Sequence, residues 1–250
     1  MNKVNGIHKY INQESQFYKY GFDLLRCDYH LWQKFIKKPF EAYIQDSLLK
    51  YNKQYKLDYL FNYHNVFENN NQDHHAFIKF ISRRIPEDVI NSKNEYLMIA
   101  FEKLGLLFQK EFRLYNNKIE FRVVRPNQPD NNLLHRDHWF PYFKGLLNLY
   151  IPLCGSTFSS VLKIVPESHH WTEEDVIPTF FYNEGKRLGE NGILYSTPTI
   201  KECKKEIILH KPDVLEGDLM YFSPMIIHGG GSNDNSHSTR FSLELRLEII

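Results

Sequence analysis

Apolar residues in the first half of the chain recur at helical spacing. Between residues 16 and 110 they stand mostly three or four positions apart, as Tyr96 and Ala100 do. This spacing lines up side chains on one side of a helix. We therefore expect residues 1–117 to be mainly helical, with the clearest helices near residues 85–111.

An Asn-rich stretch at residues 63–77 interrupts this pattern. It reads YHNVFENNNQDHHAF and has few regularly spaced apolar positions. Because Asn and Asp side chains hydrogen-bond to nearby backbone, such a stretch favours turns. We expect a loop there, with His74 and His75 as a solvated surface pair.

The pattern changes at Lys118. From there on, short β-branched and aromatic runs are separated by Gly, Pro, Asn and Asp, which is typical of strands. The expected strands are residues 119–125, 146–153, 160–166, 206–210, 218–223 and 241–249. The last run alternates apolar and polar residues from Phe241 to Ile249, so it predicts a half-buried strand.

The two halves are expected to form one domain. No linker, repeat or low-complexity tract separates residues 1–117 from residues 118–250, and 250 residues suit a single β domain with additions. The pattern predicts a mainly β fold, a sandwich or jelly roll at residues 118–250, with the N-terminal helices packed on its outside.

Composition narrows the choice of partner and compartment. The 31 Lys and Arg residues nearly balance the 30 Asp and Glu residues, so no overall field attracts nucleic acid or an anionic membrane. No run of 18 apolar residues and no signal peptide is present, which predicts no membrane contact. Cys27, Cys154 and Cys203 form no C-x-x-C pair, and this fits a reducing cytoplasm.

The segment LLHRDHWF carries a candidate metal site. His135 and Asp137 stand two residues apart, so on an extended segment both side chains point the same way while Arg136 faces away. A face of two histidines and one carboxylate holds ferrous iron and leaves the opposite coordination positions open. His228 is the best donor of the second imidazole, because it follows a strand pattern and a Pro224 break and precedes three glycines.

The last strand offers an anchor for a carboxylate. Arg240 and Ser242 share its polar face, and a guanidinium can fork onto a carboxylate while the hydroxyl adds a hydrogen bond. Arg246 lies on the same face, about 20 Å further along at roughly 3.3 Å per residue. Arg240 is preferred because it is nearer the glycines that follow His228.

Taken in order, these segments resemble the 2-oxoglutarate-dependent dioxygenases of the phytanoyl-CoA hydroxylase type. The resemblance covers about residues 122–247. Its segments are RVVRP at 122–126, His135-x-Asp137, NLYIPL at 148–153, SSVLKIVPESHHW at 159–171, Pro212, Gly217-Asp218, Phe222, His228-Gly229 and Arg240. The fifth-to-last residue of the 159–171 segment, Glu167, stands where the family usually has Gly, a departure that affects the local turn.

The resemblance implies both fold and chemistry. It implies a double-stranded β-helix (jelly roll, cupin-like) in which His135, Asp137 and His228 bind Fe(II). It also implies that 2-oxoglutarate chelates the iron, that Arg240 and Ser242 hold its far carboxylate, and that O2 is consumed. A small molecule would be hydroxylated, with release of succinate and CO2. Halogenating relatives have a small residue in place of Asp137, so the carboxylate implies no halogenation.

Several polar side chains keep two interpretations. Lys118, Arg122 and Arg125 either reach the cosubstrate or form a solvated sheet face, and Asn148 and Tyr150 face either the pocket or the core. His138 could be a ligand by spacing but is expected on the other face, and Trp139 is expected to form a pocket wall. His169 and His170 are explained by a Pro-x-Ser-His turn without metal. His74 and His75 could alternatively belong to a lid over the substrate.

Two rival functions remain on the residues alone. The same centre could desaturate, cyclise or epimerise its substrate, since these reactions differ only in the fate of the substrate radical. A non-catalytic β-sandwich that binds carbohydrate is the other rival, but it needs neither an open three-ligand face nor an Arg-x-Ser anchor. We expect a small polar metabolite or biosynthetic intermediate as the substrate.

Overall fold

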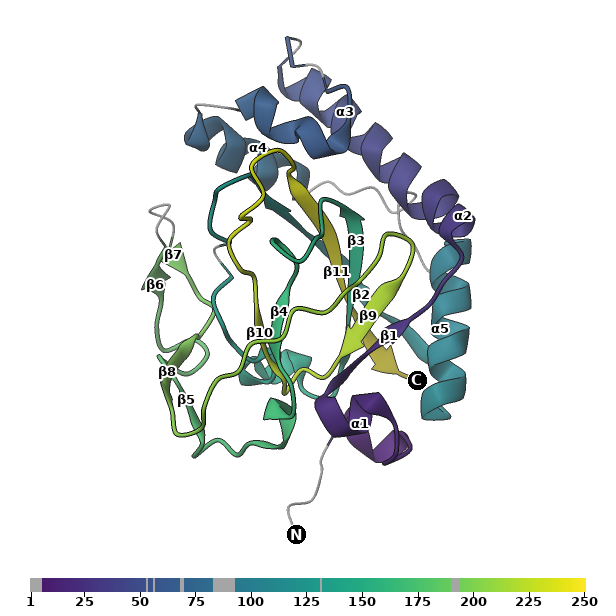
Figure 1. Ribbon diagram of the computed structural model, residues 1–250, viewed down its shortest axis with the longest axis vertical. Helices are drawn as coiled ribbons and strands as arrows, with labels where there is room; N and C mark the ends of the chain where they lie inside the picture. Colours follow the sequence, from purple (N-terminus) through teal and green to yellow (C-terminus); the bar gives the residue numbers. More distant parts are fainter. Residues whose placement is uncertain are drawn as a thin grey trace.

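The protein is a layered β structure with helices along one side (Figure 1). The computed structural model describes residues 6–52, 54–55, 57–67, 70–82, 93–130, 132–189 and 194–250. Its α-helices are α1 (Gln16–Tyr20), α2 (Tyr29–Trp32), α3 (Lys38–Tyr51), α4 (Asn71–Ser82) and α5 (Glu95–Phe108). A π-helical segment, Gln33–Lys37, joins α2 to α3, and a 3-10 helix spans Leu60–Phe67.

The strands form one large sheet and three two-stranded ones. The large sheet has the order β1-β9-β3-β11-β2, and the pairs are β10-β4, β5-β8 and β6-β7. All of these pairings are antiparallel. The bounds are β1 (Phe22–Leu25), β2 (Phe112–Val124), β3 (Leu147–Cys154), β4 (Lys163–Val165), β5 (Val176–Pro178), β6 (Arg187–Leu188), β7 (Leu194–Tyr195), β8 (Ile200–Cys203), β9 (Leu219–Phe222), β10 (Ile227–Gly229) and β11 (Arg240–Ile249). The predicted mainly β fold with helical additions is therefore confirmed.

Strand β11 shows how the two faces of the large sheet are used. Its apolar residues point toward the helices, where the Phe241 ring lies 6.4 Å from that of Phe40 and 5.2 Å from that of Tyr63. The alternate residues point to the opposite face, where Arg240 and Ser242 are fully buried and Glu244, Arg246 and Glu248 are partly buried. The predicted half-buried strand is confirmed from Glu244 onward, whereas at Arg240 and Ser242 the polar face is also buried, between two layers of strands.

Several other predicted elements differ from the structure. Residues 206–210 form no strand, and β1 at Phe22–Leu25 was missed within a half expected to be helical. The stretch 63–77 is largely helical rather than a loop. Asn70 explains the last difference, since its side chain accepts the backbone N–H of Asp73 at 2.9 Å and caps α4.

His74 lies inside this helical layer and not on the surface. It is 6% exposed, and its Nδ1 lies 3.0 Å from the hydroxyl of Tyr63. Burial, followed by the charges of Arg125 and His75, lowers the pKa of His74 to about 3. The expectation of a solvated pair at His74 and His75 is therefore wrong for His74.

The buried imidazole of His74 should make the protein sensitive to acid. Because its folded pKa lies below the unfolded value of about 6.5, the unfolded chain binds more protons between those values, so stability falls as pH falls through that window. Between pH 7 and pH 5, wild type should lose about 2 kcal/mol more unfolding free energy than the His74→Gln variant. Urea unfolding at both pH values tests this, and equal losses in the two proteins would contradict it.

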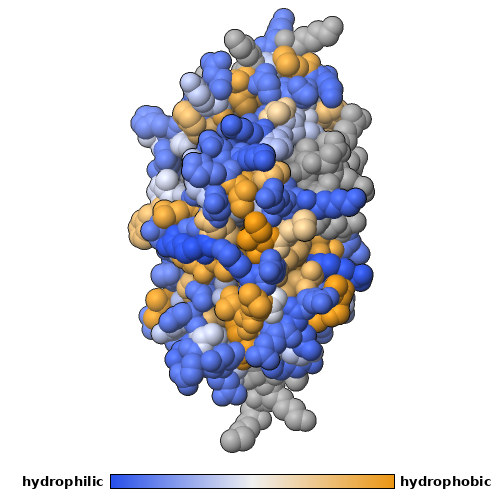
Figure 2. Space-filling model, turned by 90° about the vertical axis from the view of Figure 1, so that its right-hand side faces the viewer, coloured by the Kyte–Doolittle hydropathy of each residue, from blue (hydrophilic) through white to orange (hydrophobic). Residues whose placement is uncertain are grey.

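The surface carries scattered apolar side chains. The helices at the right of Figure 1 face the viewer in Figure 2, which shows apolar groups interspersed with polar ones. Helix α5 exposes Met98, Leu106 and Leu107. Among the described residues, no helix combines the length and hydrophobicity needed to cross a membrane.

Candidate metal centre

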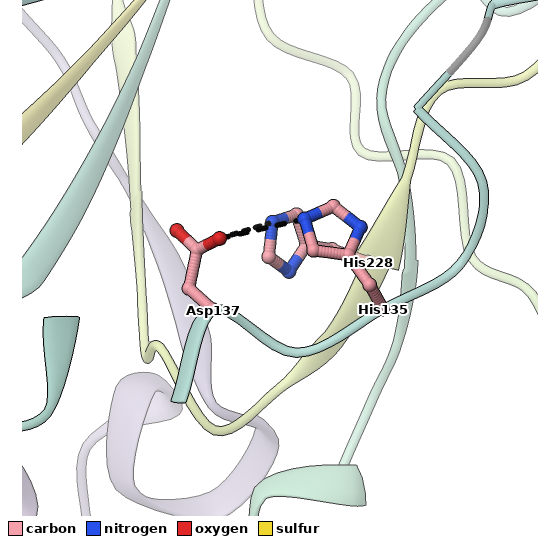
Figure 3. Close-up of side chains that lie close together, drawn as sticks. All are labelled: His135, Asp137 and His228. Carbon is pink, nitrogen blue, oxygen red and sulfur yellow. Dashed lines mark ion pairs between the residues drawn. The ribbon is translucent and has the colours of Figure 1, made fainter. Parts of the chain in front are cut away.

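Three buried side chains converge between the two layers of strands. His135 and His228 form an antiparallel bridge, with backbone N–H to carbonyl distances of 2.9 and 3.0 Å. Asp137 follows at the start of a 3-10 turn, Asp137–Trp139. Its Oδ1 lies 3.4 Å from Nε2 of His135 and 4.0 Å from Nε2 of His228 (Figure 3). One potential ligand atom from each residue lies within 4.8 Å of the others.

The backbone fixes both imidazole rings. Nδ1 of His135 lies 2.7 Å from the carbonyl of Leu133, and Nδ1 of His228 lies 3.1 Å from the carbonyl of Ile226. A carbonyl only accepts hydrogen bonds, so each Nδ1 carries the proton and each Nε2 keeps its lone pair for a metal. Hydrogen bonds of this kind orient histidine ligands in metal sites.

The charge states also suit a metal. Burial raises the pKa of Asp137, but the Arg246 guanidinium and the two imidazoles outweigh burial and hold this pKa well below its usual value. Burial, reinforced by His135, lowers the pKa of His228 to about 3. At neutral pH the site therefore presents a carboxylate and a neutral His228 imidazole, the forms that bind metal.

Arg246 approaches the centre directly, which the sequence did not predict. Its Nε and Nη2 donate to Oδ2 of Asp137 at 3.1 and 2.9 Å. About 20 Å along β11 separates Arg246 from Arg240, and it is Arg246 that contacts the carboxylate of the candidate metal site. The structure places the two arginines at opposite ends of the same inner face.

Arg240 and Ser242 lie on that inner face, as expected. The terminal nitrogens of Arg240 are occupied, because Nη2 pairs with Asp130 and Nη1 donates to the carbonyl of Ser160. The expected fork is therefore already used by the protein. Among the described residues, neither Arg240 Nε nor Ser242 Oγ has a hydrogen-bond partner, so these are the donors left for an added carboxylate.

Arg122 of β2 and Arg125 just after this strand are candidate cosubstrate contacts that point to different faces of the large sheet. Arg122 pairs with Glu244 at 3.1 Å on the inner face, opposite Ser242. Arg125 instead donates to the backbone carbonyl of Phe67 and links the sheet to the helical layer. The side chain of Lys118 lies outside the described residues.

Asn148 and Tyr150 of β3 also face the interior. Asn148 lies opposite Arg246 and is 2% exposed, and in the described part of the structure its side-chain amide has no hydrogen-bond partner. The hydroxyl of Tyr150 lies 2.7 Å from that of Ser156. Of the two interpretations of Asn148, the structure favours the pocket-facing one, because an unpaired buried amide calls for a ligand.

Local turns hold the centre together. Gly230 allows the close approach of Asp130, since a Cβ at this position would overlap its carboxylate. Glu167 adopts φ 66°, so the turn forms with Glu in the left-handed conformation that favours glycine. The next residue, Ser168, accepts the backbone N–H of Ile227 at 2.8 Å and ties this turn to β10.

A cavity of about 650 Å³ is lined in part by residues that neighbour the metal-centre residues in sequence. It is lined by His138, which follows Asp137, and by Met225, which precedes β10. His8 also lines it, and its Nε2 lies 2.8 Å from the hydroxyl of Ser223. His169, expected to serve only a turn, stacks on His8 with ring centroids 4.6 Å apart. The position of His8 in the cavity wall could not be predicted from the sequence, because no motif surrounds this residue.

Comparison with known proteins gives matches in structure alone. No family model matches the chain, and no curated protein sequence matches it. The apo structure of the non-heme monooxygenase ThoJ matches with a TM-score of 0.54 and 11% identity, over 95% of this chain and 77% of that one. SnoK, a non-heme alpha-ketoglutarate-dependent carbocyclase from nogalamycin biosynthesis, matches with a TM-score of 0.50 and 13% identity, over 96% and 85%.

A third match differs in length. The crystal structure of EvdMO1 has a TM-score of 0.48 and 13% identity over 93% of this chain, which spans 48% of that protein. At such identities the likeness shows the fold alone. The chain has the jelly-roll, double-stranded β-helix fold, as predicted from its sequence.

Proposed function

We propose that this protein is a non-haem Fe(II)- and 2-oxoglutarate-dependent oxygenase of the phytanoyl-CoA hydroxylase type. The observation that carries the proposal is the buried cluster of His135, Asp137 and His228, whose ligand atoms converge within 4.8 Å. Two imidazoles and one carboxylate on one face are the donor set of non-haem ferrous oxygenases. The jelly-roll fold supports it, since solved relatives with this fold include the alpha-ketoglutarate-dependent SnoK.

The chain's residues prepare the site in defined ways. Nε2 of His135, Nε2 of His228 and Oδ1 of Asp137 would hold the iron, with both rings kept in place by backbone carbonyls. When bound, Fe(II) with 2-oxoglutarate and O2 supplies the oxidising chemistry, which hydroxylates the substrate and releases succinate and CO2. Burial of all three ligands keeps bulk water from the reacting centre.

Arg240 and Ser242 are proposed to bind the far carboxylate of 2-oxoglutarate. Within the described residues, Arg240 Nε and Ser242 Oγ are buried on the inner face of β11 without a hydrogen-bond partner. A carboxylate placed between them would satisfy both groups. The Arg240 charge would strengthen these bonds, because hydrogen bonds from a charged donor are about twice as strong as neutral ones.

The substrate is proposed to be a small polar metabolite or biosynthetic intermediate bound in the cavity next to His138. A volume of about 650 Å³ fits a small molecule. Most of the exposed surface of the cavity is apolar, with Trp171 and Met225 on its wall. Polar contacts are available from His138, Lys144, Glu173 and further polar side chains. Such a wall with a few polar groups is the usual make-up of a small-molecule site.

A substrate screen tests the proposed function. Protein loaded with Fe(II) is incubated in air with 2-oxoglutarate and a library of small polar metabolites, and succinate is measured. We expect at least one compound to stimulate succinate formation and to gain one oxygen atom by mass spectrometry. A Met225→Trp variant, which partly fills the cavity, should raise the KM for that compound and leave the iron content unchanged.

Other outcomes of the screen would revise the proposal in different ways. Loss of two hydrogens, ring closure or epimerisation would keep the centre and replace hydroxylation. A chlorinated product would contradict Asp137 as a ligand. Absence of both iron binding and oxygen uptake would contradict an oxygenase and favour a non-catalytic binding module.

A further inference from the structure

We infer that Arg246 is a positioning residue that holds one oxygen of Asp137, so that the other oxygen alone faces the metal. This inference rests on the proposed function for the presence of the metal. It concerns a residue that is not one of the three candidate ligands. Its role would be to set how the carboxylate ligand binds.

The two oxygens of Asp137 have separate partners. Oδ2 accepts two hydrogen bonds from Arg246, from Nε at 3.1 Å and from Nη2 at 2.9 Å. Oδ1 instead faces Nε2 of His135 at 3.4 Å and Nε2 of His228 at 4.0 Å. Figure 3 shows this division, with one oxygen directed at the imidazoles and the other turned away.

Arg246 is itself held on two further sides. Its Nη1 lies 3.3 Å from Glu120, and its guanidinium lies 3.9 Å from the centroid of the Phe143 ring. The side chain is only 12% exposed. A planar guanidinium fixed by a carboxylate and an aromatic face has little freedom to rotate, so it can impose an orientation on Asp137.

The charge of Arg246 need not weaken metal binding. Glu120 lies on the other side of the guanidinium and offsets its positive charge. The hydrogen bonds from Arg246 can therefore orient Asp137 without placing an unbalanced positive charge beside the bound metal ion. Partners of this kind typically contribute ten- to hundredfold to metal affinity or activity.

Binding through one oxygen has a chemical consequence. With Oδ2 engaged by Arg246, Asp137 supplies one ligand atom, and the three protein ligands occupy three positions around the metal. The remaining positions of an octahedral ion stay open for other ligands. If Oδ2 were released, Asp137 could turn and occupy a fourth position.

Cobalt titration tests the role of Arg246 without using turnover. The wild type, Arg246→Met and Arg246→Lys are titrated with Co(II), and the Kd and the visible absorption spectrum are recorded. Arg246→Met should weaken Co(II) binding by about ten- to hundredfold and alter the spectrum of the saturated protein. Arg246→Lys should weaken it by roughly tenfold, because an ammonium keeps the charge but not the two-point contact.

Arg113→Met is the matched control. Arg113 pairs with Glu248 between the same two strands, two residues beyond Arg246 along β11, but it is 62% exposed and its ion pair does not involve Asp137. This variant should keep the wild-type Kd and spectrum.

The inference is overturned if Arg246→Met binds Co(II) with the wild-type Kd and spectrum. Should that variant fail to fold, the same result for Arg246→Lys overturns it. Failure of the proposed function looks different, since wild type would then bind no Co(II), or would bind it equally well after His228→Ala. Either of those results removes the metal site and this inference with it.

Discussion

His228→Ala should abolish turnover and strip most of the iron from the protein. His228 supplies one of three ligand atoms, and its neutral imidazole is held with Nε2 toward Asp137. Alanine offers no replacement donor in a buried site. Changes beside a metal ligand already cost ten- to hundredfold, so loss of a ligand should lower succinate formation by more than about a hundredfold. Iron content per chain and succinate formation are the measurements.

His138→Ala is the control for this experiment. His138 follows Asp137 and could be a ligand by its spacing, but its side chain lines the neighbouring cavity and is not part of the converging cluster. Iron content should therefore stay at the wild-type level in this variant, whatever happens to the substrate KM. Full iron occupancy and activity in both His135→Ala and His228→Ala would show that the metal site has been assigned wrongly. Thermal melts confirm that each variant is folded.

The convergence of the three candidate ligands could be predicted because it depends on the local backbone geometry and on the order of the strands along the chain. Two residues apart on extended backbone, His135 and Asp137 had to share a side, and the bridge to His228 then needed only a neighbouring strand. The structure forms that bridge. The alternation of β11 likewise separated Arg240 and Ser242 from the apolar face.

The contact of Arg246 could not be predicted from its own strand. Distance along β11 says how far Arg246 is from Arg240, but it says nothing of what approaches from the facing layer. Asp137 approaches Arg246 from that layer, because the segment after His135 turns into a 3-10 helix. This turn brings the Asp137 carboxylate within hydrogen-bonding distance of Arg246. A partner supplied by another layer of the fold leaves no periodic signal in either segment.

Period-two alternation also leaves the environment of each face open. It separates Ser242 from Leu243 but does not say which face meets water. In β11 both faces are covered at Arg240 to Leu243, one by helices and one by the second layer of strands. The helical content of residues 63–77 was missed for a related reason, because Asn70 acts there as a cap while composition alone favoured a loop.

Removing Arg240 should raise the KM for 2-oxoglutarate by on the order of a hundredfold or more. Arg240 is 1% exposed, and in the part of the chain that the structure describes its Nε has no hydrogen-bond partner, so it can donate to an added carboxylate. Losing a buried charged partner typically costs about 2–5 kcal/mol, and each 1.4 kcal/mol corresponds to tenfold in affinity. Ser242→Ala should have a smaller effect, roughly tenfold, because it removes one hydrogen bond from a neutral donor to a carboxylate, worth about 1.5 kcal/mol.

Because Arg240 pairs with Asp130, the effect of removing Arg240 on the KM for 2-oxoglutarate must be measured in a background without the Asp130 charge. Arg240→Ala alone would leave the buried Asp130 carboxylate uncompensated, which can destabilise a fold by about 3–5 kcal/mol. The informative comparison is therefore Asp130→Asn against the double variant Asp130→Asn/Arg240→Ala. Asp130→Asn releases Nη2 of Arg240 from its ion pair, so its KM for 2-oxoglutarate should be no higher than that of wild type. The double variant should then show the increase of a hundredfold or more, at unchanged iron content. If its KM stayed within threefold of that of Asp130→Asn while Arg246→Met raised KM strongly, the anchor would be Arg246, and the diacid would lie at the Asp137 end of β11.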